Sequence, residues 1–120
     1  MSPQNNKHIN LSYLKQLSNG SNEFIVQMIS IFMVQTPEAT NLMDKHLKSN
    51  EWKLLKGVIH KMKPSFSFMG IKELETIAIS AEKYCETETD LDKLPGLIQR
   101  IKEVCSEAIN ELEEEKKQFI

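Results

Sequence analysis

One histidine in the stretch 52–70 has the neighbours best suited to chemistry in this sequence. Lys56, His60, Lys63 and Ser67 follow one another at offsets of four, three and four residues. In an α-helix this spacing puts all four on one face, beside a separate apolar stripe. That stripe contains Leu54, Leu55, Val58, Ile59, Met62, Phe66 and Met69. The imidazole is therefore open to a partner, and the lysine one turn to either side suits an anion.

Three kinds of histidine chemistry can be compared with this pattern. Metal binding needs further ligands at helical spacing, and the residues around His60 supply none, while lysines repel a cation. A hydrolase triad needs an oxyanion hole, which a smooth helix surface does not offer. Nucleophilic attack on phosphorus fits better. An ordinary surface histidine without a function is the simplest alternative.

A phosphorylated imidazole would gain from the two flanking lysines. The phosphoryl group adds roughly two negative charges, and Lys63 and Lys56 would each offset them by at most about 1 kcal/mol. That is too little to catalyse the transfer alone. We therefore expect no metal or cofactor on this chain, and a catalytic Mg²⁺ on a partner protein.

Pro64 sits four residues after His60. A proline there removes the hydrogen bond to the His60 carbonyl and costs about 3 kcal/mol in a helix interior. A local bend beside the ring would change the surface that a partner approaches, which favours a functional interpretation of this position.

Length and composition describe one ordinary domain. The 120 residues are 40% apolar and 27% charged, which is typical of a globular protein with a real core. The net charge of −2 and the absence of a long basic run argue against nucleic acid as a partner. Cys85 and Cys105 lack metal spacing and fit a core in a reducing compartment. No apolar run could cross a membrane and the start resembles no signal peptide, so we expect a cytoplasmic protein without direct membrane contact.

Apolar residues recur with a helical period along most of the chain. The pattern predicts a short helix around 11–17, a long helix from Ser21 or Asn22 to about Leu47, helices over 51–68 and 72–86, and a last helix starting at Asp90 or Asp92. Asn10 is the expected N-cap of the first helix and Ser49-Asn50 the turn and cap before the third. Pro37 falls within the second helix, which we expect to kink there and continue.

Short connections between long helices make sequential helices antiparallel neighbours. The sequence therefore predicts an all-α fold, an antiparallel up-down four-helix bundle with a short extra N-terminal helix. We divide the chain into a flexible leader, 1–8, and a single bundle domain, 9–118, and we expect a monomer.

Residues 60–70 resemble the phosphoacceptor signature of the histidine phosphotransfer (HPt) domain family, His-x-Leu-Lys-Gly-Ser-x-x-x-x-Gly. His60, Lys63, Ser65 and Gly70 match, and Met62 replaces the leucine. The likeness extends over nearly the whole chain, since residues 24–63, with the mid-helix proline, look like the second and third helices of the family.

This resemblance implies a phosphorelay intermediate with His60 as phosphoacceptor and Lys63 as the residue that stabilises the phosphoryl group. It implies a phosphocarrier without an ATP-binding kinase domain. Its partners would be receiver domains of response regulators or hybrid sensor kinases, and it could be free-standing or a fragment of a hybrid histidine kinase. Phe68 is a candidate docking contact.

Two positions depart from the family pattern. Pro64 replaces the usual glycine. Glu82 stands where some members have a glutamine that bonds the histidine ring, and we weigh it both as such a partner and, slightly more strongly, as a solvated helix residue. These departures support the alternative hypothesis, a four-helix-bundle interaction module that takes no phosphate.

Overall fold

The computed structural model describes residues 6–120, which contain five α-helices and two short 3₁₀ turns and no strand. The helices are α1 (Ser12–Ser18), α2 (Asn22–Lys48), α3 (Trp52–Phe68), α4 (Lys72–Thr87) and α5 (Leu94–Lys116), and the turns are η1 (Leu91–Lys93) and η2 (Lys117–Phe119). The predicted helices are confirmed with boundary shifts of a few residues.

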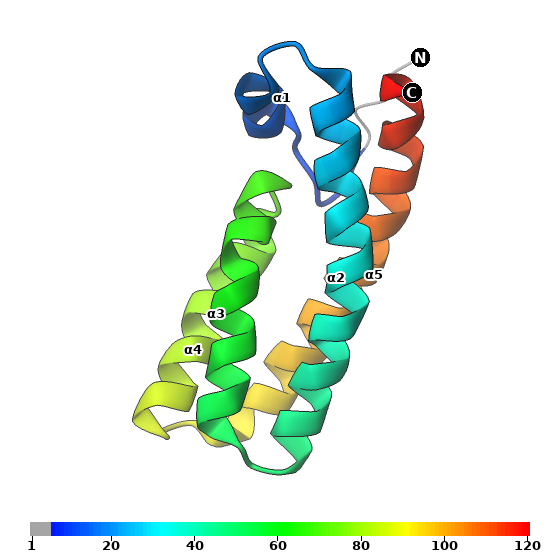
Figure 1. The fold of residues 1–120 in the computed structure, drawn as a ribbon. Coiled ribbons are helices and arrows are strands. Elements are labelled where there is room, and N and C mark those ends of the chain that lie inside the picture. Colours follow the sequence, from blue (N-terminus) through cyan, green and yellow to red (C-terminus); the bar gives the residue numbers. More distant parts are fainter. Residues whose placement is uncertain (1–5) are drawn as a thin grey trace.

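The four long helices form an up-down bundle (Figure 1). Each packs against its neighbour in chain order, and α5 closes the ring by packing against α2. The short helix α1 lies at one end, beyond the last turn of α3, and packs against α2 (Figure 1). The all-α four-helix architecture with an extra N-terminal helix is therefore confirmed.

The core runs along the centre of the bundle and draws on every long helix. From α3 it takes Leu55, Ile59, Met62 and Phe66, each at most 5% exposed. The predicted stripe was too wide on one side, because Leu54 is 52% exposed. It precedes Leu55 by one residue, a rotation of about 100° that turns it out of the core.

Helix α2 continues through Pro37, so the predicted continuation is confirmed, and the kink there stays a prediction. It begins at the predicted cap, where the Ser21 hydroxyl accepts a hydrogen bond from the Phe24 amide at 3.1 Å. The predicted cap of α1 is confirmed in part: Leu11 occupies the N-cap position, but the Asn10 side chain accepts a hydrogen bond from the main-chain N–H of Ser12 at 2.9 Å. The cap of α3 was predicted wrongly, because Glu51 is its N-cap and Asn50 lies in the preceding turn with a left-handed φ of 56°.

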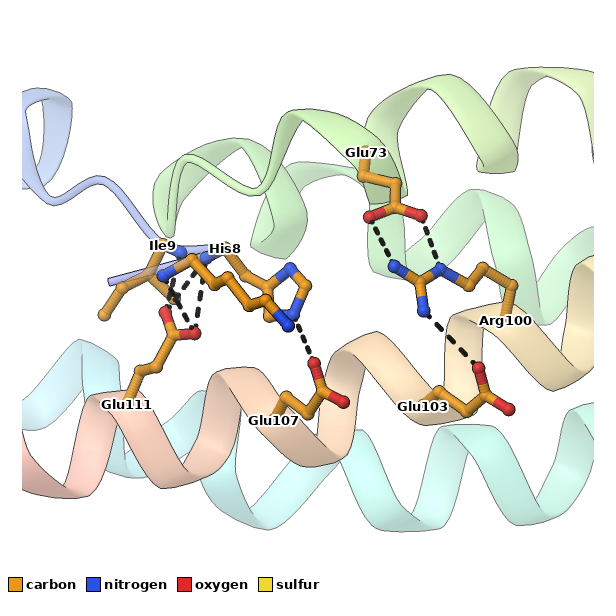
Figure 2. Close-up of polar contacts among 8 residues, drawn as sticks. His8, Ile9, Glu73, Arg100, Glu103, Glu107 and Glu111 are labelled. Carbon is orange, nitrogen blue, oxygen red and sulfur yellow. Dashed lines mark hydrogen bonds and ion pairs between the residues drawn. The ribbon is translucent and has the colours of Figure 1, made fainter. Parts of the chain in front are cut away.

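The chain before α1 is attached to α5 (Figure 2). The main-chain N–H groups of residues 7–9 donate to the Glu111 carboxylate over 3.1 to 3.3 Å. The His8 Nε2 atom lies 2.6 Å from Glu107, and the His8 side chain is only 6% exposed. Residues 6–8 of the predicted flexible leader are thus held in place, while residues 1–5 lie outside the described part.

An ion pair ties α4 to α5 further along the same side (Figure 2). The Arg100 guanidinium donates two hydrogen bonds to Glu73, at 2.6 and 3.1 Å, and also approaches Glu103 at 3.4 Å. This two-pronged geometry fixes the relative position of the two helices better than a single contact would.

Gly70 joins α3 to α4 at a point where the N-terminal segment passes close by. Its φ of 64° is left-handed, and the main-chain N–H of Asn10 donates to the main-chain carbonyl of the neighbouring Met69 at 3.0 Å. A Cβ atom on residue 70 would overlap the main-chain carbonyl of Asn10. Only glycine combines the required φ with this approach.

We predict that Gly70→Ala lowers the free energy of unfolding by about 2 to 4 kcal/mol, because it adds a backbone collision to an unfavourable φ. Urea denaturation measures the effect. Gly20→Ala is the matched control, because Gly20 has a φ of 86° but nothing within 4 Å of an added Cβ, so it should lose only about 1 kcal/mol. Equal losses in the two variants would contradict the role of the Asn10 contact.

Candidate functional site

His60 projects from α3 on the side opposite the core. Its side chain is 71% exposed, whereas its neighbour Ile59 is completely buried. The two residues are consecutive, so the burial of one turns the other outward. The predicted accessibility of this imidazole is confirmed.

Glu82 of α4 binds both polar side chains of the site. Its Oε2 atom lies 2.8 Å from the His60 Nδ1 atom, and its Oε1 atom lies 2.7 Å from the Lys63 ammonium. The residue is 9% exposed overall. Our slightly favoured interpretation of Glu82 as a solvated residue was therefore wrong, and the alternative of a partner for the ring is correct.

The protonation of Glu82 decides which nitrogen of His60 is available. Burial alone would raise the pKa of Glu82, but the hydrogen bonds from Lys63 and His60 outweigh burial and lower that pKa. The group is therefore an ionised carboxylate at neutral pH, and a carboxylate only accepts hydrogen bonds. It follows that Nδ1 of His60 carries a proton, and that the lone pair of the neutral ring lies on Nε2.

Cationic side chains surround this carboxylate in a shallow cleft between α3 and α4. The charged groups that line it with His60 are Lys53, Lys56, Lys63, Lys83, Glu82 and Glu86. Lys56 pairs with Glu86 at 3.0 Å, so it is less free to offset charge at the ring than the sequence alone suggested. Four lysines against two glutamates still leave the cleft net positive and suited to an anion.

Two of the predicted supporting residues are placed differently. The Ser67 hydroxyl donates to Glu75 at 2.8 Å and does not line the cleft, so Ser67 is not part of the site around His60. Pro64 is exposed within an unbroken α3 and also lies outside the cleft. Its missing N–H leaves the His60 carbonyl without its usual partner in the helix.

The other two histidines have different surroundings. The His8 and His46 side chains are 6% and 13% exposed, and each faces a single glutamate, at 2.6 and 2.9 Å. Both are engaged in structural contacts between segments. Only His60 combines an exposed ring with a bound carboxylate and a lysine on the same carboxylate.

A second groove runs between α2 and α3, on the other side of Gly57 from the cleft. It contains exposed apolar side chains, Leu42 at 43% and Leu54 at 52%. The sequence pattern placed Leu54 in the apolar stripe of its helix. The predicted docking residue Phe68 is instead half-buried and stacks on Tyr13, with ring centroids 6.1 Å apart.

The thiols and acidic groups suggest no second reactive centre within residues 6–120. Cys85 and Cys105 are free and buried, as predicted, and burial raises their pKa values to about 11 and about 12. No three His, Cys, Asp or Glu residues of this part cluster as metal ligands would. None of its helices is long and apolar enough to cross a membrane.

We predict that Glu82 makes the protein sensitive to acid. Because its pKa is lowered from 4.5 on folding, its ionised form contributes stability above about pH 4.5 that is lost as the pH falls through the folded-state pKa. Glu82→Gln should therefore show a smaller loss of unfolding free energy than the wild type between about pH 5 and about pH 3.

Urea denaturation at several pH values measures this difference. Glu73 and Glu107, whose pKa values are also lowered, are present in both proteins, so their contributions cancel. Equal acid sensitivity in the two proteins would show that the bonds to His60 and Lys63 do not stabilise the Glu82 carboxylate.

Comparison with known proteins gives one family and one closely similar fold. The model of the Hpt domain family matches residues 27–115. The crystal structure of histidine-containing phosphotransfer protein B (HptB) from Pseudomonas aeruginosa PAO1 has a TM-score of 0.84 over 93% of this chain and 96% of that one, with 17% sequence identity. At this identity the match shows the fold. No curated protein matches the sequence. Because the family model spans most of its length, the chain belongs to the Hpt domain family, the histidine phosphotransfer domains of two-component phosphorelays.

Proposed function

We propose that His60 is the phosphoacceptor, which takes a phosphoryl group from the aspartate of one receiver domain and passes it to the aspartate of another. The observation that carries this proposal is the bond between Nδ1 of His60 and the buried Glu82 carboxylate, at 2.8 Å. It presents an exposed ring whose nucleophilic lone pair lies on Nε2.

The transfer then needs no base from this chain. The Nε2 lone pair forms a bond to phosphorus while the bond from phosphorus to the aspartate oxygen breaks, and the electron pair of that bond stays on the aspartate carboxylate. The ring keeps its Nδ1 proton, which stays hydrogen-bonded to Glu82, and becomes a phosphoimidazolium cation. The return step runs through the same bonds in reverse order.

The charges of the cleft support the arriving group. Lys63 lies one turn after His60 on the same side of α3, and its side chain is 36% exposed. We assign it the role of stabilising the phosphoryl group, with Lys56 in a weaker supporting role because of its pair with Glu86. We place the Mg²⁺ on the receiver, beside the aspartate that donates the phosphoryl group.

The groove between α2 and α3 supports a receiver as the partner. It adjoins His60 through Gly57, and Leu42 and Leu54 give it exposed apolar surface of the kind found at protein interfaces. We further propose that the chain acts in the cytoplasm as a monomeric phosphocarrier, with the kinase activity on another domain or protein.

A second candidate function is an interaction module whose histidine takes no phosphate. The carboxylate of Glu82 favours this function. Its negative charge lies beside Nδ1 of the ring and repels a negatively charged phosphoryl group on Nε2. Binding without transfer would need the same docking surface but not the lone pair on Nε2.

We predict that His60→Gln abolishes transfer of labelled phosphoryl from a phosphorylated receiver in the presence of Mg²⁺, because glutamine offers no ring nitrogen. Since His60 is exposed, the variant should fold and still bind the receiver. His8→Gln is the control, because His8 faces Glu107 on α5 and should leave labelling unchanged.

The acid and alkali stability of the label, and the proteins that carry it, separate the outcomes. Acid-labile, alkali-stable label on the wild type and on His8→Gln, but not on His60→Gln, supports a phosphohistidine at His60. Receiver binding without label on any of the three proteins would favour the interaction module. Label on His60→Gln would mean that another residue is the phosphoacceptor.

A further inference from the structure

Glu82 and a phosphoryl group on His60 would compete for the same ammonium. The Lys63 Nζ atom is already 2.7 Å from the Glu82 Oε1 atom. The carboxylate side chain is 11% exposed and bound at both oxygens, so it is fixed, while the lysine is 36% exposed on a flexible stem. Lys63 is the member of the pair that can move.

We propose that Glu82 limits the lifetime of the phosphohistidine by holding Lys63 away from the phosphoryl group. The inference rests on His60 being the phosphoacceptor. In this role Glu82 is a positioning residue, because it acts on the phosphoryl group through Lys63 and through the ring.

The other charges around the ring do not remove this competition. From α3, Lys53 and Lys56 face the cleft, and from α4, Lys83 and Glu86. Lys56 is paired with Glu86 at 3.0 Å, and only Lys63 is bound to the carboxylate that also holds the ring. A phosphoryl group on Nε2 that draws Lys63 toward itself therefore acts against the bond between Lys63 and Glu82.

Spontaneous loss of the phosphoryl group gives a measurable lifetime. A water oxygen bonds to phosphorus as the bond from phosphorus to Nε2 breaks, and the electron pair of that bond returns to Nε2. The water protons are released or kept by the inorganic phosphate, and the ring leaves as neutral imidazole with its Nδ1 proton in place. An ammonium beside the phosphoryl oxygens opposes this step. The negative charge of these oxygens falls as the bond to Nε2 breaks in a loose, metaphosphate-like transition state, so the cation stabilises the adduct more than the transition state.

The test uses the full chain, phosphorylated with phosphoramidate so that no receiver is needed. After the donor is removed, phosphorus NMR follows the half-life of the phosphohistidine at one fixed pH. The variants are Glu82→Gln, Lys63→Met and the double variant. Nitrogen NMR of the His60 ring reports whether Nδ1 is still a hydrogen-bond donor in each of them.

We expect Glu82→Gln to lengthen the half-life about fivefold, the size of effect that a half-exposed charge pair produces. Lys63→Met should shorten it less than about twofold in the wild type, where Glu82 occupies the ammonium, and about fivefold in the Glu82→Gln background. This dependence of one substitution on the other is the signature of competition, which a purely structural role of Glu82 would not produce.

Glu75→Gln is the matched control. Glu75 is also on α4 and also bonds a side chain of α3, the Ser67 hydroxyl at 2.8 Å, but it contacts neither Lys63 nor His60. Its replacement by glutamine removes one carboxylate charge from the same helix interface but keeps an oxygen that can accept from Ser67, and it should leave the half-life unchanged. Equal lengthening in Glu75→Gln and Glu82→Gln would overturn the proposal in favour of a general charge effect.

The remaining outcomes separate this inference from the proposed function. A wild-type phosphohistidine at His60 whose half-life is unchanged or shorter in Glu82→Gln would overturn the inference and leave the phosphocarrier intact. No phosphohistidine at His60 in the wild type would overturn both. If Glu82→Gln does not fold, the half-life of Lys63→Met decides: a shortening of less than about twofold supports the inference, and one of about fivefold or more overturns it, because Lys63 was then already free to hold the phosphoryl group.

Discussion

The burial of one side of α3 determines where the reactive ring points. Ile59 and Met62 lie in the core on either side of His60 in the sequence, and neither can turn outward without exposing apolar surface. Burying a side chain of this size contributes about 1.5 to 3 kcal/mol, far more than any contact of an exposed imidazole. The direction of His60 is therefore set by residues that never touch the phosphoryl group.

The register of α3 against α4 supplies the rest of the site. Three of the side-chain contacts between the two helices share one register: Ser67 to Glu75, His60 to Glu82 and Lys56 to Glu86. From one pair to the next, the residue number on α3 falls by as much as the residue number on α4 rises, as expected for antiparallel helices packed in a constant register. The turn at Gly70 fixes that register, so the backbone conformation of one glycine bears on the geometry of a site several turns away.

Local patterns in the sequence predicted what depends on one helix. The helical period is enough to place His60 outside the core and Lys63 on the same side, and the bundle follows from helix lengths and short connections. The wrong predictions about the site around His60 depend on what another helix brings. Ser67 shares the predicted face of His60, but Glu75 takes up its hydroxyl.

The sequence left the role of Glu82 open, with a solvated residue slightly favoured, for the same reason. Whether a glutamate on α4 is solvated or buried depends on the register between two helices, which a period in one helix does not specify. The contact of residues 7–9 with Glu111 is still harder to predict, because it joins segments about a hundred positions apart in the sequence. No local signal in a polar leader could indicate that contact.

The carboxylate at the ring has opposite effects on the two halves of a relay. It fixes the Nδ1 proton and so presents the lone pair of Nε2 to an incoming phosphoryl group, which favours acceptance. In the competition that we propose, its charge and its hold on Lys63 would then make the adduct less stable than it would be beside an unpaired lysine. A carrier that bound the phosphoryl group most tightly would be slow to release it, because stabilising an intermediate raises the barrier that follows. A glutamate at position 82 therefore suits a site that must pass its phosphoryl group on rather than store it.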